Sequence, residues 1–142
     1  MDIKIEELNF EDLEQYKNLI DSCFGVSNDI EYYKNNYNKN ANYVIFVAKY
    51  NDKIIGSVTF YKIELFTFSF QPALEVFNVA VLEEVRRNNI AKALLSHVVE
   101  YAKNNNFKSI FLTCLDTAFG AHKLYESLGF KKTSSVKYNL SL

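Results

Sequence analysis

The chain has 142 residues, the length of one ordinary domain. Hydrophobic residues make up 49% of it and charged residues 23%, a balance that supports a buried core and excludes an intrinsically disordered chain. The formal net charge of −1 provides no broad basic field, so we expect neither nucleic acid nor an anionic membrane surface as a partner.

Targeting and cysteine signals indicate a cytoplasmic protein. No stretch approaches the roughly 20 apolar residues needed to cross a bilayer, and the acidic start MDIKIEELNF lacks the basic and apolar regions of a signal peptide. Cys23 and Cys114 lie far apart and form no CxxC pair, which argues against a zinc ribbon or a disulfide framework. We therefore expect no metal and two buried free thiols.

The first part of the chain predicts a strand and two helices. Residues 2–8 alternate apolar and charged side chains, as a strand does. Residues 10–24 have apolar residues at helical spacing, with Asn9 placed to cap the helix and Gly25 placed to end it. A second, short helix near 29–37 carries three tyrosines.

A hairpin is expected next. Residues 43–50 and 53–63 are rich in β-branched and aromatic types and are separated by an Asn-Asp pair, which tolerates the positive φ of a tight turn. Residues 64–70 alternate phenylalanines with other residues until Pro72 interrupts the pattern. We interpret this segment as a ragged strand end or edge whose phenylalanines belong to the core.

The second half predicts a strand at 73–81, a helix at 90–106 and a strand at 107–115, which a helical crossover makes parallel or neighbouring. A short helix at 118–128, closed by a glycine, and a terminal strand at 130–140 complete the chain. The order β-α-α-β-β-β-α-β-α-β predicts a single α/β (α+β) domain, with a mixed, mostly antiparallel sheet that has a central β-α-β unit and is flanked by helices.

The junction between the strand at 73–81 and the helix that follows carries Arg86 and Arg87. A helix N-terminus offers unpaired N–H groups and a partial positive charge, and the two guanidiniums add cationic donors. The junction is therefore a candidate phosphate site. The alternative interpretation of the two arginines is a solvated surface loop.

Three segments resemble the GNAT acetyltransferase superfamily. Residues 86–91 (RRNNIA) stand where the family has R/Q-x-x-G-x-G/A, residues 124–130 (LYESLGF) are similar to its C-terminal LYExxGF segment, and residues 53–56 (KIIG) resemble its third-strand entry. The three occur in the family's order. The resemblance implies an N-acetyltransferase that transfers the acetyl group of acetyl-CoA to a primary amine by direct attack.

By this resemblance acetyl-CoA is the co-substrate, its pantetheine arm lies along the strand that leads into the arginine loop, and the loop holds its pyrophosphate. A backbone N–H near the end of the strand would polarise the thioester carbonyl. The residues implied in cofactor binding are Val79, Ala80, Val81, Arg86, Arg87, Asn88, Asn89, Ile90, Ala91 and Lys92.

The resemblance also implies two catalytic residues. Tyr125 matches the family's tyrosine, and its phenol has a basicity that suits protonation of a departing thiolate. Glu75 resembles a position from which some members remove the amine proton. The alternatives are a core tyrosine and a solvated carboxylate. Asp116 and His122 are other candidates for the base, although His122 also fits a surface histidine.

Two positions depart from the family pattern. Asn89 replaces the first motif glycine, and we expect it to adopt the left-handed backbone that Asn accepts more readily than other side chains do. Ala118 replaces an Asn that contacts pantetheine in many members. These departures keep open a non-catalytic acetyl-CoA-binding module, or a module of the same fold that acts through protein contacts along residues 66–70.

The acceptor is not specified by the sequence. In the family its site is lined by the first two helices and the loop after the third strand, here 24–37 and 64–72, so we expect an aromatic pocket. A homodimer is a reasonable expectation. A Rossmann or P-loop protein is excluded, because the chain has four glycines and neither GxGxxG nor GxxxxGK[ST].

Overall fold

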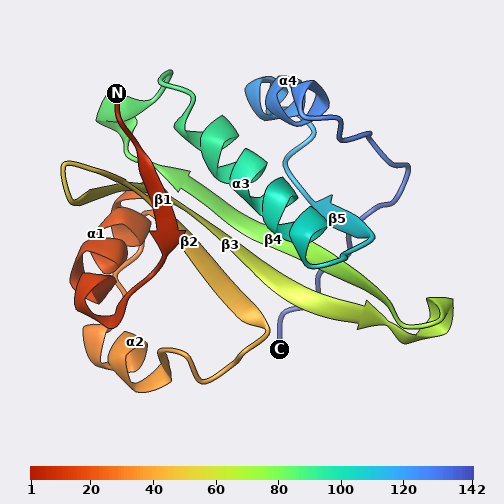
Figure 1. Ribbon diagram of the computed structural model, residues 1–142, viewed down its shortest axis with the longest axis horizontal. Coiled ribbons are helices and arrows are strands. Elements are labelled where there is room, and N and C mark those ends of the chain that lie inside the picture. The colour runs from red at the N-terminus through yellow and green to blue at the C-terminus, as the bar shows by residue number, and fades with distance from the viewer.

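The computed structural model describes residues 1–142 as one sheet with helices on both faces (Figure 1). Its strands and helices are β1 (Lys4–Glu7), α1 (Leu13–Phe24), α2 (Ile30–Asn36), β2 (Tyr43–Tyr50), β3 (Lys53–Leu65), β4 (Gln71–Val81), α3 (Ile90–Asn104), β5 (Ser109–Leu112) and α4 (Phe119–Ser127). Short 3-10 turns, Phe10–Asp12, Phe66–Phe68 and Glu83–Val85, precede α1, β4 and α3. The predicted order is confirmed except for the last strand.

The sheet is a meander in the order β1-β2-β3-β4-β5. The first four strands pair antiparallel with their neighbours, and β5 pairs parallel with β4 after the α3 crossover. In the β2–β3 turn, Asn51 has φ 49° and Asp52 has φ 63°, as a primed hairpin turn requires. The predicted hairpin and the predicted β-α-β crossover are therefore confirmed.

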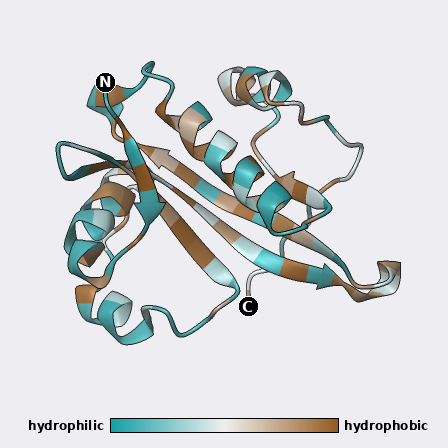
Figure 2. Ribbon diagram, viewed as in Figure 1, coloured by the Kyte–Doolittle hydropathy of each residue, from teal (hydrophilic) through white to brown (hydrophobic).

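The larger core lies between the sheet and α3, which crosses the sheet at the front of Figure 1. Figure 2 shows brown apolar bands on the strands beneath α3. Alternate residues of β2, β3 and β4 face a helical stripe whose members recur at spacings of three and four. The stripe consists of Ile90, Leu94, Leu95, Val98 and Ala102, all buried.

A smaller core lies on the opposite face of the sheet, under α1. Leu13, Tyr16 and Leu19 of α1 pack against Val47 of β2 and Ala80 of β4. Gly25 ends α1 in the left-handed conformation with φ 62°, as its place in the sequence predicts. The helix start is different from the prediction, because a 3-10 turn occupies residues 10–12 and the Asn9 side chain makes no capping hydrogen bond.

Two predictions for chain segments are wrong. Residues 130–140 form no strand, because no other strand pairs with them and the apolar side chains after Phe130, which are Val136, Tyr138 and Leu140, face solvent. Residues 66–70 are not core: they form the tip of the β3–β4 hairpin, which projects beyond the sheet in Figure 1. Phe66, Phe68 and Phe70 are 72%, 68% and 52% exposed, and Pro72 lies inside β4 rather than ending a strand.

Lys49 on β2 joins two carboxylates into an ion-pair cluster. Its Nζ lies 2.8 Å from Oε1 of Glu6 and 2.6 Å from Oδ2 of Asp12, so it links β1 to the turn that begins α1. The hydrogen bonds from Lys49 and then Lys4 lower the pKa of Glu6 below its ordinary value. Conversely, the contacts with Asp12 and Glu6 raise the pKa of Lys49.

In the Glu6→Gln variant, the stability of the protein is expected to depend less on pH in the acid range. The pKa of Glu6 is lower in the folded protein than in the unfolded chain, where it is near 4.3. The ionised carboxylate therefore stabilises the fold above the unfolded-state pKa, and this stabilisation is lost as pH falls through the folded-state pKa. The free energy of unfolding, measured by urea titration from pH 6 to pH 3, should therefore fall less steeply in this variant. The exposed neighbour Glu7, changed to Gln, is the control. Equal slopes in wild type and Glu6→Gln would contradict this account.

No helix of the protein combines the length and the apolar character that crossing a membrane requires.

Candidate acyl-transfer site

Strands β4 and β5 separate, and this split is the centre of the candidate site. Their parallel pairing ends at Val76 and Leu112, whereas β4 continues to Val81. The β4 edge over residues 77–81 therefore has no strand partner on the β5 side. Unpaired backbone groups along an extended edge are where an extended ligand can add as a further strand. The predicted pantetheine-binding residues Val79, Ala80 and Val81 lie on this edge.

A β-bulge marks the start of the split. On β3, Thr59 pairs with Asn78 and Phe60 with Val76, so Phe77 is the extra residue of β4. Before the bulge, Leu74 and Val76 face α3, and alternation turns Glu75 toward the α1 and α2 face of the sheet. Glu75 is half-buried there, beside Tyr61 of β3 and Phe111 of β5 in register.

The loop before α3 has the backbone that its motif requires. Arg87 has φ 71° and Asn89 has φ 59°, so the expected left-handed Asn89 is confirmed. No side chain caps α3, which leaves the N–H groups of Ile90, Ala91 and Lys92 in the first turn without an intrahelical partner. The Asn88 side chain instead braces the loop, because its Nδ2 donates to the Val85 carbonyl at 2.9 Å.

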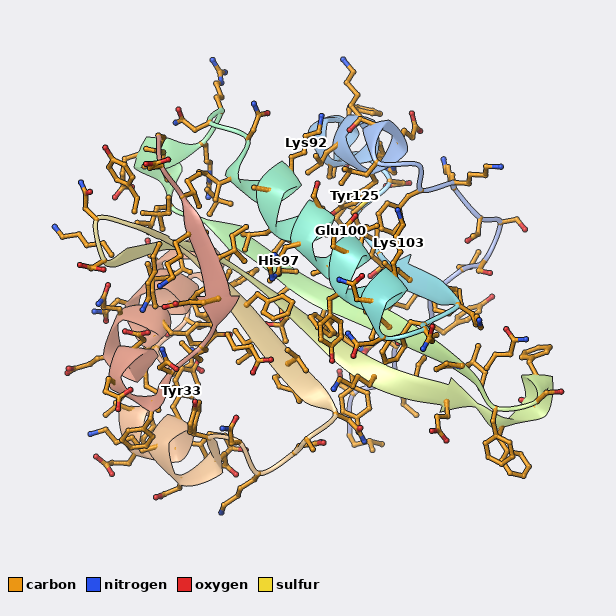
Figure 3. The ribbon with its side chains drawn as sticks, in the orientation of Figure 1. Tyr33, Lys92, His97, Glu100, Lys103 and Tyr125 are labelled. Atoms are coloured by element: carbon orange, nitrogen blue, oxygen red, sulfur yellow. The ribbon has the colours of Figure 1, made fainter.

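The exposed surface of this loop is cationic. Arg86 and Arg87 are both exposed and lie immediately before the helix N-terminus, and Lys92 projects from the first turn of α3 on the side of α4 (Figure 3). Nε of Arg86 donates to the Val81 carbonyl at 3.2 Å, and Sγ of Cys23 lies 3.5 Å from the same oxygen. That carbonyl is therefore already engaged, and the positive charge faces outward.

Tyr125 lies on the other side of the split from Glu75. It projects from α4 into the space beside α3 (Figure 3), is half-buried, and packs against the α3 core and edge-on to Phe130 at 6.1 Å. Burial, and next the electrostatic influence of Cys114, raises the pKa of Tyr125 above its ordinary value of 10.0. The phenol is consequently protonated at neutral pH and can act as a donor.

A pocket of about 710 Å³ opens on the α1 and α2 face. It has an aromatic lining of five tyrosines, supplied by α1, α2, the residue that follows α2, and β2: Tyr16, Tyr32, Tyr33, Tyr37 and Tyr43. Burial raises the pKa of Tyr16 to about 12 and raises those of Tyr33 and Tyr43 as well. These three side chains are thus uncharged phenols rather than phenolates at physiological pH.

The predicted aromatic pocket exists, but its lining is partly different from the prediction. Residues 64–72 do not line it, because the hairpin carries them away from α2. Tyr16 and Tyr43 were missed as lining residues, since each fits a core pattern in its own segment. The rings of Tyr43 and Tyr61 pack edge-on with their centroids 6.3 Å apart, and Tyr61 lies opposite Glu75 in the β3–β4 register. A row of side chains therefore connects the pocket to the split.

A thiol and an imidazole were also missed as a pair. Sγ of Cys114 lies 3.9 Å from Nδ1 and 3.8 Å from Nε2 of His122. Cys114 is exposed and Cys23 is half-buried, so the prediction of two buried thiols is wrong. The other candidate base, Asp116, is exposed, and its backbone carbonyl rather than its carboxylate meets His122. No group of three potential ligands gathers as a metal site.

Comparison with known proteins assigns the family. The model of the acetyltransferase (GNAT) family matches residues 13–130, which covers α1 through α4, and the chain therefore belongs to this family. The family resemblance predicted from the RRNNIA and LYESLGF segments is thereby confirmed.

Individual relatives agree with this assignment. The chain is 35% identical over 112 residues to N-acetylaspartate synthetase of Xenopus tropicalis, covering 79% of this chain and 38% of that protein. It is 31% identical over 94 residues to human N-acetyltransferase 8B, and the match covers 66% of this chain and 41% of that protein. The chain thus spans about two fifths of the length of these relatives.

Among solved structures, an aminoglycoside acetyltransferase, meta-AAC0020, from an uncultured soil metagenomic sample superposes with a TM-score of 0.85 at 26% identity. The match covers 99% of this chain and 96% of that one, and it confirms the fold class over essentially the whole chain.

Proposed function

We propose that the protein is an N-acetyltransferase that moves the acetyl group of acetyl-CoA to a primary amine by direct attack. One observation carries the proposal: the split between β4 and β5 lies between Tyr125 on the α3 and α4 side of the sheet and Glu75 on the α1 and α2 side. A thioester held in the split would have a proton donor on one face and a proton acceptor on the other.

Acetyl-CoA fits the residues on the α3 side. Its pyrophosphate would be held by the cationic loop and first helical turn, Arg86 to Lys92, whose N–H groups lack intrahelical partners. Asn89 meets the backbone requirement of the missing glycine. Its pantetheine arm would extend along Val79, Ala80 and Val81, and Ala118 leaves one side of that arm without an amide contact. The bound coenzyme supplies the activated acetyl group.

The proton transfers are assigned to the two side chains on either face. Glu75 would accept a proton from the amine, which must be neutral to attack the thioester. Tyr125 would donate a proton to the departing thiolate, and the raised pKa of its phenol keeps that proton in place at neutral pH. The amine would reach the split from the tyrosine pocket along the row formed by Tyr43 and Tyr61.

The wider setting follows from composition and family. We place the protein in the cytoplasm, with acetyl-CoA and an amine-bearing substrate as its partners, without nucleic acid or membrane binding, and as a possible homodimer. A non-catalytic module of the same fold is the second candidate, favoured by the exposed phenylalanines at the β3–β4 hairpin tip. Acetyl-CoA binding without acetyl transfer to any amine would support that second candidate.

The test is steady-state release of coenzyme A thiol with a panel of amines, followed by a pH–rate profile on the best substrate. Glu75→Gln is expected to lower kcat/KM by about 10²-fold or more and to remove the acid limb of the profile. Glu64→Gln, an exposed glutamate of β3, is the control. An acid limb that survives in Glu75→Gln would remove Glu75 from the mechanism while leaving the acetyl transfer itself established.

A further inference from the structure

Cys114 and His122 form a thiol–imidazole pair just beyond the end of β5. Cys114 lies two residues beyond Leu112, where β5 stops pairing with β4. If the parallel register continued, Cys114 would stand opposite Asn78, but the strands have separated by this point. His122 comes from α4, one turn before Tyr125 on the same helical face. His122 and the proposed acid Tyr125 therefore lie on the same side of α4.

The contacts of His122 define its protonation. Its Nε2 lies 3.1 Å from the Leu115 carbonyl and 3.2 Å from the Asp116 carbonyl. Because carbonyl oxygens only accept hydrogen bonds, we assign the ring hydrogen of the neutral imidazole to Nε2. Nδ1 then keeps its lone pair, and Sγ of Cys114 lies 3.9 Å from Nδ1 and 3.8 Å from Nε2. An imidazole nitrogen with a free lone pair beside a thiol is a base that can take the thiol proton when the two come within hydrogen-bond distance.

The Cys114 thiol contacts His122, and His122 lies one helical turn before Tyr125 on α4. The Tyr125 phenol is the group assigned to the coenzyme sulfur. A thioester held in the split therefore lies beside a second nucleophile, which is exposed and has its own base. Holding two reacting groups together replaces a bimolecular encounter with an effectively unimolecular one.

We infer that Cys114 is an acetyl acceptor in this protein. When no amine is present, the acetyl group of bound acetyl-CoA is transferred to this thiol. The inference rests on the proposed function. The bond between Sγ of Cys114 and the carbonyl carbon forms, and the bond from that carbon to the coenzyme sulfur breaks. The thiol proton passes to Nδ1 of His122, and the coenzyme thiolate takes a proton from Tyr125, so no oxidant or reductant is needed.

Cys23 provides an internal comparison. Its thiol is half-buried on α1, and its Sγ lies 3.5 Å from the Val81 carbonyl, which can only accept a hydrogen bond. Cys23 thus has a hydrogen-bond acceptor but no imidazole beside it. The two thiols of one chain therefore differ in the feature on which the inference depends.

The experiment incubates the 142-residue protein with acetyl-CoA in the absence of amine and follows its intact mass, with peptide mapping of the acetylated site. Wild type and Cys23→Ser should each gain one acetyl group at Cys114, and Cys114→Ser should gain none on a cysteine. His122→Gln can still donate to the Leu115 carbonyl but cannot accept the thiol proton, so it should acetylate about a hundredfold more slowly. Urea-unfolded protein gives the background reactivity of the two thiols.

Acetyl-CoA binding is measured on the same samples by equilibrium dialysis. Acetylation of Cys114 in folded protein, above the unfolded background and dependent on His122, supports the inference. Bound acetyl-CoA with no acetyl on Cys114, or with equal labelling of Cys23, overturns the inference and leaves the proposed function standing. Absence of acetyl-CoA binding overturns both.

Discussion

Tyr125→Phe is expected to lower kcat by about 10²-fold or more while the dissociation constant of acetyl-CoA changes little. The variant keeps the ring that packs on Phe130 and on the α3 core and removes only the hydroxyl. A coenzyme thiolate would then depart without its proton donor. Because the pKa of Tyr125 is raised, its phenol should stay protonated above pH 10 in the wild type. The alkaline limb of the wild-type pH–rate profile should therefore lie above the ordinary titration range of tyrosine.

Tyr101→Phe is the matched control for this prediction. Tyr101 is another half-buried tyrosine of the same core, on α3, where it stacks on Phe107 at 6.2 Å far from the cationic loop end of the helix. Stopped-flow thiol release with saturating acetyl-CoA separates the chemical step from binding. If Tyr125→Phe turned over as fast as Tyr101→Phe, the phenol would have no part in acetyl transfer.

Gly56→Ala is expected to destabilise the protein by about 1–3 kcal/mol, the usual cost of an overpacked core. Gly56 lies on β3 where α3 begins, and an added Cβ would lie 3.0 Å from the Ala80 carbonyl oxygen and 3.0 Å from Cγ2 of Ile90. The neighbouring backbone oxygen cannot move without disturbing β4. The close approach that Gly56 permits therefore fixes the first turn of α3 against the strand proposed to bind pantetheine.

Gly120→Ala makes the same change where a Cβ would meet nothing within 4 Å, on α4. That variant should unfold at an equal or higher urea concentration, because alanine favours a helix over glycine. A comparison of the two variants by urea unfolding separates the effect of the crowded Cβ at position 56 from the general effect of replacing a glycine by alanine. Equal stability of Gly56→Ala and wild type would show that β3 and α3 are not held together at this position.

The sequence predicts well what is decided locally. The stripe of α3 at helical spacing, the Asn-Asp turn of the β2–β3 hairpin and the Gly25 stop of α1 are each determined within a few residues, and all are confirmed. The left-handed Asn89 belongs to the same group, since its short polar side chain tolerates this backbone.

Features that depend on distant partners were predicted less well. The alternating phenylalanines at 66–70 have a strand pattern. However, β3 and β4 pair directly with each other up to Leu65 and Gln71, so residues 66–70 form the hairpin loop between them and face solvent. Residues 130–140 alternate in the same way without a strand beside them. The tyrosine pocket needs Tyr16, Tyr33 and Tyr43 from three different elements, and a local pattern does not indicate which tyrosines share a cavity.

The most direct test of the account is the thermal midpoint of the purified protein with and without acetyl-CoA. At about 100 times its dissociation constant, a ligand of the folded state adds roughly 2.7 kcal/mol, which raises the midpoint by several degrees. Our account predicts this rise, because the Asn89 loop, the cationic helix start and the open β4 edge together suit the coenzyme. An unchanged midpoint at millimolar acetyl-CoA would contradict it and would favour a GNAT fold that acts through protein contacts alone.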